Sequence, residues 1–164
     1  MQTDDFRRGM RRLAGAVTIV TAGKGDDAGG LTATAVCSLT AEPPRLLACL
    51  NSGGATFDIL RRHGRFCVNL VGSSDRAAAE VFAGIGAAPG EDRFAAGAWV
   101  RTEDRAPRLA SALAAFECSV HSITMLATHG LVIGDVDAVH ITGADDPLLY
   151  HEGRFARLAL PGAA

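Results

Sequence analysis

Short apolar and β-branched runs, punctuated by glycine and proline, dominate the hydrophobic pattern of this chain. They predict strands at 16–21, 31–40, 46–50, 66–71, 116–123, 131–140 and 148–150. Helical spacing of apolar residues predicts helices at 4–13, 55–63 and 74–83, and Pro107 suits the first turn of a brief helix ending at Leu113. Few of these elements alternate as strand, helix, strand. The pattern therefore predicts a mainly β protein, an antiparallel barrel with peripheral helices, in preference to a doubly wound parallel sheet.

Length and charge narrow the class of protein. The 164 residues suffice for a single domain, 1–164, with one core. A formal net charge of −2 provides no broad basic surface, so no nucleic-acid partner is expected. The N-terminus carries no apolar signal segment, and no run approaches the ~18 apolar residues of a membrane span. We expect a soluble, cytoplasmic protein without a membrane partner.

Common catalytic motifs are missing from the sequence. It contains no G-x-G-x-x-G after the first strand, no Walker-type phosphate loop, no H-E-x-x-H and no G-x-S-x-G. The five histidines are scattered, and the four cysteines form no C-x-x-C, so no metal site is expected. Three of the cysteines lie in apolar runs, which favours buried, reduced thiols. A metal-dependent hydrolase or a serine hydrolase is therefore disfavoured.

The most informative segment is G-L-T-A-T-A-V-C-S-L-T-A-E-P-P, residues 30–44. A single strand here would place small apolar residues on one face and Thr32, Thr34, Val36, Ser38 and Thr40 on the other. Such a face lets a flat polar heterocycle approach the backbone, whose N–H and C=O groups can bond the ring edge. An ordinary exposed strand with β-favouring threonines fits the pattern as well, and the pattern alone leaves both open.

A second segment, N-S-G-G-A-T-F-D-I at 51–59, leads from a buried strand into a helix. Its small residues leave backbone N–H groups accessible at the positive end of that helix, which suits a phosphate. The alternative is an ordinary helix start capped by Ser52 or Thr56. Taken together, the two segments suggest a phosphorylated, flat cofactor.

The motifs T-A-T-A-V-C-S-L-T-A-E-P-P, A-C-L-N, R-F-C-V-N-L, A-T-H-G-L-V-I-G-D-V and P-L-L-Y-H-E-G-R-F occur in one fixed order. In these motifs the chain resembles the short-chain flavin reductase family, most closely the reductase components of 4-hydroxyphenylacetate 3-monooxygenases. The resemblance implies an FMN-binding split antiparallel β-barrel, usually a homodimer. It further implies FMN, with FAD possible, as the flavin, NADH or NADPH as hydride donor, and a flavin-dependent monooxygenase as partner.

The resemblance also implies roles for individual residues. The flavin ring would be contacted, largely through the backbone, by Thr32, Ala33, Thr34, Ala35 and Val36. Phe82 would lie near the ring. The ribityl chain and the phosphate of the flavin would be held by Asn51, Ser52 and Thr56. His129, as the catalytic candidate, and Tyr150 would border the nicotinamide, and Arg154 would meet a phosphate of the pyridine nucleotide.

Some alternatives stay open at this level. His129 read alone is equally a hydrogen-bonded structural histidine, and Tyr150 equally a packing residue. Many relatives carry a β-branched or polar residue where this chain has Gly130, so a looser loop beside His129 is expected. The electron acceptor could instead be a corrinoid or another dedicated partner, and a non-enzymatic flavin-binding protein is the third hypothesis.

Overall fold

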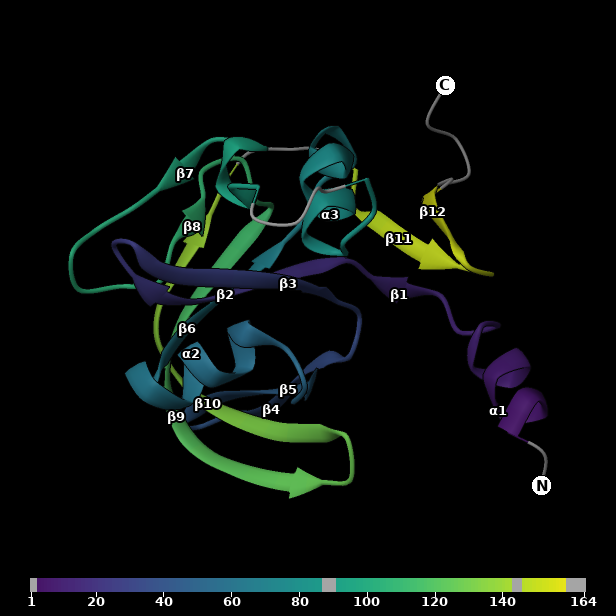
Figure 1. The fold of residues 1–164 in the computed structure, drawn as a ribbon, viewed down its shortest axis with the longest axis horizontal. Helices are drawn as coiled ribbons and strands as arrows, with labels where there is room; N and C mark the ends of the chain where they lie inside the picture. The colour runs from purple at the N-terminus through teal and green to yellow at the C-terminus, as the bar shows by residue number, and fades with distance from the viewer. Residues whose placement is uncertain (1–2, 87–90, 143–145, 159–164) are drawn as a thin grey trace.

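A computed structural model describes residues 3–86, 91–142 and 146–158 of the chain (Figure 1). Its helices are α1 (Thr3–Met10), α2 (Ala55–His63) and α3 (Arg76–Phe82), with 3-10 turns η1 (Ser73–Asp75) and η2 (Arg93–Ala95). Its strands are β1 (Gly15–Ala16), β2 (Thr18–Lys24), β3 (Asp27–Ala33), β4 (Val36–Ala41), β5 (Pro44–Asn51), β6 (Arg65–Leu70), β7 (Trp99–Val100), β8 (Arg108–Leu109), β9 (Ala114–Leu126), β10 (His129–Ile141), β11 (Leu148–His151) and β12 (Arg154–Arg157).

The main sheet is antiparallel, with strand order β3-β2-β6-β9-β10-β5-β4. Its two edge strands, β3 and β4, follow one another in the chain, and only Thr34 and Ala35 lie between them. The sheet therefore curls so that the chain passes directly from one edge strand to the other through these two residues, but no ladder pairs β3 with β4. This arrangement confirms the predicted split antiparallel barrel. A smaller sheet, β1-β11-β12, flanks it.

The single strand expected at 31–40 is wrong, because the chain bends at Thr34 and Ala35. β3 pairs with β2, ending at Ala33, and β4 pairs with β5, starting at Val36. The two-residue break reverses which positions face inward. Leu31 and Ala33 pack on the core from β3, but from β4 it is Val36 that does so, while Leu39 is 49% exposed. The predicted continuous row of hydroxyls is therefore split between two strands.

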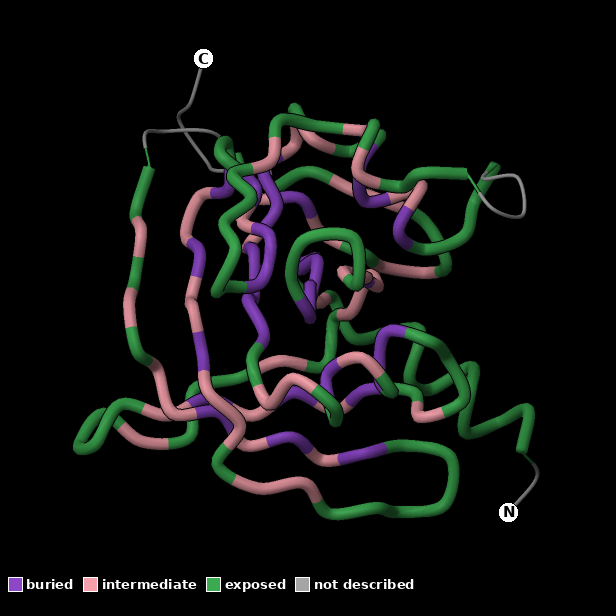
Figure 2. The backbone as a smooth tube through the Cα atoms, turned by 60° about the vertical axis from the view of Figure 1, so that its left-hand side comes forward, coloured by how far each residue is buried: buried purple, intermediate pink, exposed green. Residues whose placement is uncertain are grey.

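Buried residues gather in the barrel interior and beneath α2 and α3 (Figure 2). Val20, Leu50, Phe57, Leu60 and Phe66 form the centre of the largest cluster, in which α2 closes one end of the barrel. A second cluster, around Val17, Ile19 and Phe82, lies beneath α3. The expected helices at 55–63 and 74–83 are therefore present, the latter as η1 followed by α3.

The brief helix expected from Pro107 to Leu113 is also wrong. Arg108 and Leu109 form β8, which pairs with β7, and Leu109 lies opposite Trp99 in the register. The Leu109 N–H donates to Asn69 Oδ1 at 2.8 Å, inside the core. This buried side-chain acceptor on a distant strand holds the backbone extended.

The four cysteines, all within the described residues, are free thiols. Cys67 and Cys118 are buried, Cys49 is half-buried and Cys37 is exposed. Burial raises the pKa of the Cys118 thiol to about 12 and raises that of Cys67 as well, so both stay protonated and unreactive. No helix in the described ranges is both long and apolar enough to cross a membrane.

Candidate functional site

The loop from β5 into α2 ends in a helix start that no side chain caps. The N-cap residue is Gly54, and neither Ser52 nor Thr56 takes that role. Asn51 Oδ1 accepts from the Gly53 N–H at 2.8 Å and shapes the turn. The Phe57 N–H donates to the Gly54 carbonyl at 3.0 Å, and the cap makes no side-chain hydrogen bond to the first turn of α2, so the capped-helix alternative is wrong. This end of the helix favours an anion.

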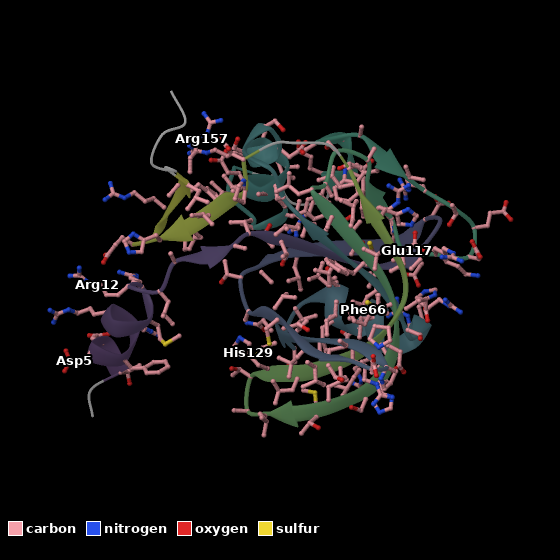
Figure 3. The ribbon with its side chains drawn as sticks, turned by 180° about the vertical axis from the view of Figure 1, so that it is seen from behind. Asp5, Arg12, Phe66, Glu117, His129 and Arg157 are labelled. Atoms are coloured by element: carbon pink, nitrogen blue, oxygen red, sulfur yellow. The ribbon has the colours of Figure 1, made fainter. Side chains whose placement is uncertain are left out.

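The same loop is joined to the turn before His129. Asn51 and His129 are directly opposite in the β5–β10 ladder. The Ser52 N–H and Ser52 Oγ both donate to the Thr128 carbonyl oxygen, each at 3.0 Å. The Thr128 hydroxyl in turn lies 2.9 Å from His129 Nδ1. Three predicted site residues thus meet at one end of the barrel, where Figure 3 labels His129 at the start of β10.

Thr56 occupies a different position from the one its predicted role suggests. Its side chain is buried, and its Oγ1 donates to the Gly30 carbonyl at 3.0 Å. Because that bond uses its only side-chain proton, Thr56 cannot donate to a phosphate in this arrangement. It instead fixes the first turn of α2 against β3.

Further along β3, Thr32, Ala33 and Thr34 line a cavity of about 270 Å³. Tyr150 and Phe155, whose rings meet edge to face at 5.4 Å, form part of its wall. The remaining lining residues are Val17, Ala83 and Ile85. The structure therefore brings together three predicted flavin-ring residues and one predicted nicotinamide residue, although Tyr150 lies 116 positions after Thr34 in the sequence.

The break between β3 and β4 supplies the polar groups beside this cavity. Thr34 and Ala35 lie outside both ladders, and both are exposed. The Ala35 carbonyl accepts from the Cys49 N–H at 2.8 Å, but sheet pairing takes up neither residue's N–H group. Thr34 and Val36 also line a second, largely apolar cavity of about 390 Å³, whose other lining residues include Leu46, Val68 and Phe116. Peptide donors therefore stand at the junction of two cavities.

Two predicted residues lie elsewhere. Phe82 is only 2% exposed and packs against Phe94 and Trp99 at ring-centroid distances of 5.2 Å each. Its ring supports β3 beneath Gly30 and presents no surface to a ligand. Arg154 is exposed opposite His151 on the β11–β12 hairpin and lines neither cavity.

Gly130 makes the segment after His129 tight, contrary to the expected looser loop. The residue is buried, and a Cβ placed on it would lie 2.4 Å from Cζ of Phe57. The Phe57 ring of α2 thus occupies the space of a side chain at position 130. Close packing of ring on backbone fixes α2 against the start of β10. Sequence reasoning missed both this contact and Thr128, although A-T-H-G contains Thr128 and Gly130.

A family model described as the flavin reductase like domain matches residues 10–159. The chain belongs to this family. It is 38% identical to the FMN reductase (NADH) RutF of Variovorax paradoxus over 157 residues, which cover 96% of this chain and 86% of that protein. The FMN reductase (NADH) RutF of Agrobacterium fabrum is 36% identical, with 92% and 86% covered.

Solved structures agree with the family assignment. The NADH:FAD oxidoreductase SgcE6 of Streptomyces globisporus, in complex with NAD and FAD fragments, matches with a TM-score of 0.85 and 30% identity, covering 98% of this chain and 94% of that one. The styrene monooxygenase flavin reductase of Pseudomonas putida matches with a TM-score of 0.82 and 28% identity, covering 96% and 99%. The family and fold implied by the sequence resemblance are confirmed; the closer likeness to 4-hydroxyphenylacetate 3-monooxygenase reductases stays a prediction.

The donors of this flavin reductase-like domain suit a flavin phosphate. The cap residue Gly54 has nothing within 4 Å of an ideal Cβ, so the approach to the first turn of α2 is open. Backbone N–H donors on such a turn match a phosphate group without a lysine or arginine. Within the described ranges, no group of three or more His, Cys, Asp or Glu side chains is placed to hold a metal ion.

Proposed function

We propose that this protein is an NAD(P)H:flavin oxidoreductase that reduces FMN, with FAD as an alternative flavin, and releases it to a monooxygenase. The uncapped start of α2 carries this proposal, because it provides a site for an anion. The Thr56 side chain holds this helix start against Gly30 of β3, and Thr32 and Ala33 at the end of the same strand line the 270 Å³ cavity. A phosphate-binding site and a cavity that could hold a flat ring, both along one strand, suit a phosphorylated flat cofactor. The RutF relatives are named FMN reductases that use NADH.

A flavin held here would supply the redox chemistry, as the acceptor of hydride from a nicotinamide. The protein's own groups bind and orient. In the proposed arrangement the first turn of α2 binds the phosphate, with Asn51 and Ser52 shaping the loop, and the peptide N–H groups at Thr34 and Ala35 bond the ring edge. Donors placed there stabilise negative charge on a reduced ring. Tyr150 and His129 border the nicotinamide, and Arg154 stays a prediction for its phosphate.

The test is NAD(P)H oxidation followed at 340 nm with the purified chain, using NADH or NADPH with and without FMN or FAD. We expect oxidation that requires added flavin and is fastest with NADH and FMN. Flavin that binds tightly and does not exchange during turnover would point to a corrinoid or another dedicated acceptor. Bound flavin without any pyridine-nucleotide oxidation would contradict the proposal and indicate a flavin-binding protein.

We also propose a homodimer. Helix α1 stands to one side of the barrel (Figure 1), and none of its residues is buried. Phe6, Met10 and Leu13 follow helical spacing, yet they are 54%, 49% and 64% exposed. Phe6 and Met10 lie one turn apart on α1 and Leu13 lies just beyond its end. Exposed large apolar side chains gathered on one segment in this way mark an interaction surface.

We expect the purified chain to sediment as a dimer, and the variant combining Phe6→Glu with Met10→Glu to shift toward the monomer. Buried carboxylates without partners oppose association. Arg8→Glu, on the polar face of the same helix, is the matched control and should leave the dimer intact. A wild-type chain that is monomeric at micromolar concentration by analytical ultracentrifugation would refute the dimer.

A further inference from the structure

Thr128, in the A-T-H-G segment, makes contacts to both the β5–α2 loop and the His129 side chain. On its main-chain side, the carbonyl oxygen accepts two hydrogen bonds from Ser52, at 3.0 Å each. On its side-chain side, Oγ1 lies 2.9 Å from Nδ1 of His129. Thr128 therefore connects the loop at the start of α2 to the His129 imidazole through its own polar atoms.

The backbone around Thr128 leaves it little freedom. Leu126 and His129 are paired across the β9–β10 ladder, so Ala127 and Thr128 form a two-residue turn. Ala127 has φ of 49°, in the left-handed region, which a tight hairpin turn requires. His129 is at the same time held opposite Asn51. The Thr128 hydroxyl in the turn and the His129 imidazole at the start of β10 belong to consecutive residues, and the turn and the pairing with β5 hold both in place.

We propose that Thr128 is a positioning residue for His129: its hydroxyl donates to Nδ1, so that Nε2 carries the proton and faces the pyridine nucleotide as a donor. A hydroxyl can donate or accept, but an imidazole with a protonated Nδ1 would turn the Nε2 lone pair toward an anionic ligand. The bond to Nδ1 decides which ring nitrogen bears the hydrogen, as a second partner does for other functional histidines. This inference rests on the proposed function.

The kinetic test uses the full chain with saturating FMN. Thr128→Val is expected to raise KM for NADH roughly fivefold, the value of one net hydrogen bond, and to leave kcat and the FMN Kd within about twofold of wild type. Thr128→Ser keeps the hydroxyl and should restore the wild-type KM. Thr124→Val, an exposed threonine on β9 of the same hairpin, is the matched control and should change nothing.

A double-mutant cycle separates positioning from general damage to the turn. In a His129→Ala background, Thr128→Val should have no further effect on KM, because the group through which it acts is gone. Additive effects of the two substitutions would overturn the proposal. A rise in the FMN Kd equal to the rise in the KM for NADH would also overturn it, because Thr128 would then act only through the β5–α2 loop and not through His129.

Tautomer state gives a readout that needs no activity. In ¹⁵N-labelled protein at alkaline pH, where imidazoles are neutral, His129 should show the Nε2–H tautomer, and Thr128→Val should show a mixture. The resonance is assigned by its loss in His129→Gln. Identical tautomer signatures in wild type and Thr128→Val would overturn the positioning role. A protein that shows the expected tautomer shift but never oxidises NAD(P)H would refute the proposed function while leaving the Thr128–His129 hydrogen bond established.

Discussion

Gly54→Asp should weaken FMN binding about 100-fold while slightly raising the stability of the protein. The cap glycine has φ −107° and ψ 151°, which any residue adopts, and open space around its Cβ position. Aspartate is among the preferred N-cap residues, so the helix should gain about 0.5–1 kcal/mol. The same carboxylate accepts hydrogen bonds from N–H groups of the first turn and repels a dianionic phosphate. A loss of a few kcal/mol of binding free energy corresponds to a rise in the FMN Kd of about two orders of magnitude. Fluorescence titration with FMN and thermal denaturation measure the two effects.

Two controls locate the Gly54→Asp effect at the phosphate. Riboflavin carries no phosphate, so its Kd should be the same in wild type and in the variant. Gly54→Asn caps the helix without a charge, so it should stabilise the protein similarly but cost much less FMN affinity. An FMN Kd within threefold of wild type in Gly54→Asp would show that the phosphate binds elsewhere.

Gly130→Val should lower the free energy of unfolding by about 3 kcal/mol, which corresponds to a drop in Tm of about 10 °C. The valine Cβ would lie 2.4 Å from Phe57 Cζ and 2.5 Å from Phe57 Cε2, and the ring is itself buried in the core. Because Phe57 belongs to α2, relief of this contact must move either the helix or the start of β10. Calorimetric or circular-dichroism melting measures the loss.

Gly9→Val is the matched control for Gly130→Val, since nothing lies within 4 Å of a Cβ at position 9. Its Tm should stay close to that of wild type. In the variant that combines Phe57→Ala with Gly130→Val, the total loss should be smaller than the sum of the two single losses, because the clashing ring is absent. Strict additivity, or an unchanged Tm in Gly130→Val alone, would show that the ring can move aside freely.

Local pattern was sufficient for most elements. The long apolar run at 131–140 lies within β10 of the main sheet, and the β-branched run at 16–21 divides between β1 of the smaller sheet, which ends at Ala16, and β2 of the main sheet, which starts at Thr18. Alternation and chain stiffness act within a few residues, so the extended conformation itself was predictable. The apolar spacing at 55–63 matches α2 residue for residue. The segment at 51–59 indicated a phosphate-binding site because small residues before a helix leave backbone N–H groups at its start accessible. The structure shows no side-chain cap at the start of α2.

Three features depended on residues far apart in the sequence. The break at Thr34 and Ala35 exists because β3 and β4 pair with different strands at opposite edges of the sheet, and no window of the sequence contains both pairings. The segment after Pro107 is extended because Asn69, on β6, binds the Leu109 N–H. Phe82 is enclosed by Phe94 and Trp99, which turns a predicted ligand contact into a core residue.

The sequence by itself determined the family, the mainly β architecture and the loop that suits a phosphate, since each follows from neighbouring residues or from motifs in order. Only the tertiary structure decided how the parts of the site meet: Ser52 on Thr128, Thr128 beside His129, and Phe57 over Gly130. The physical reason is that hydrogen bonds and close packing act over a few ångströms in space, whatever the separation along the chain. The curled sheet brings residues 51–57 and 128–130 within that reach.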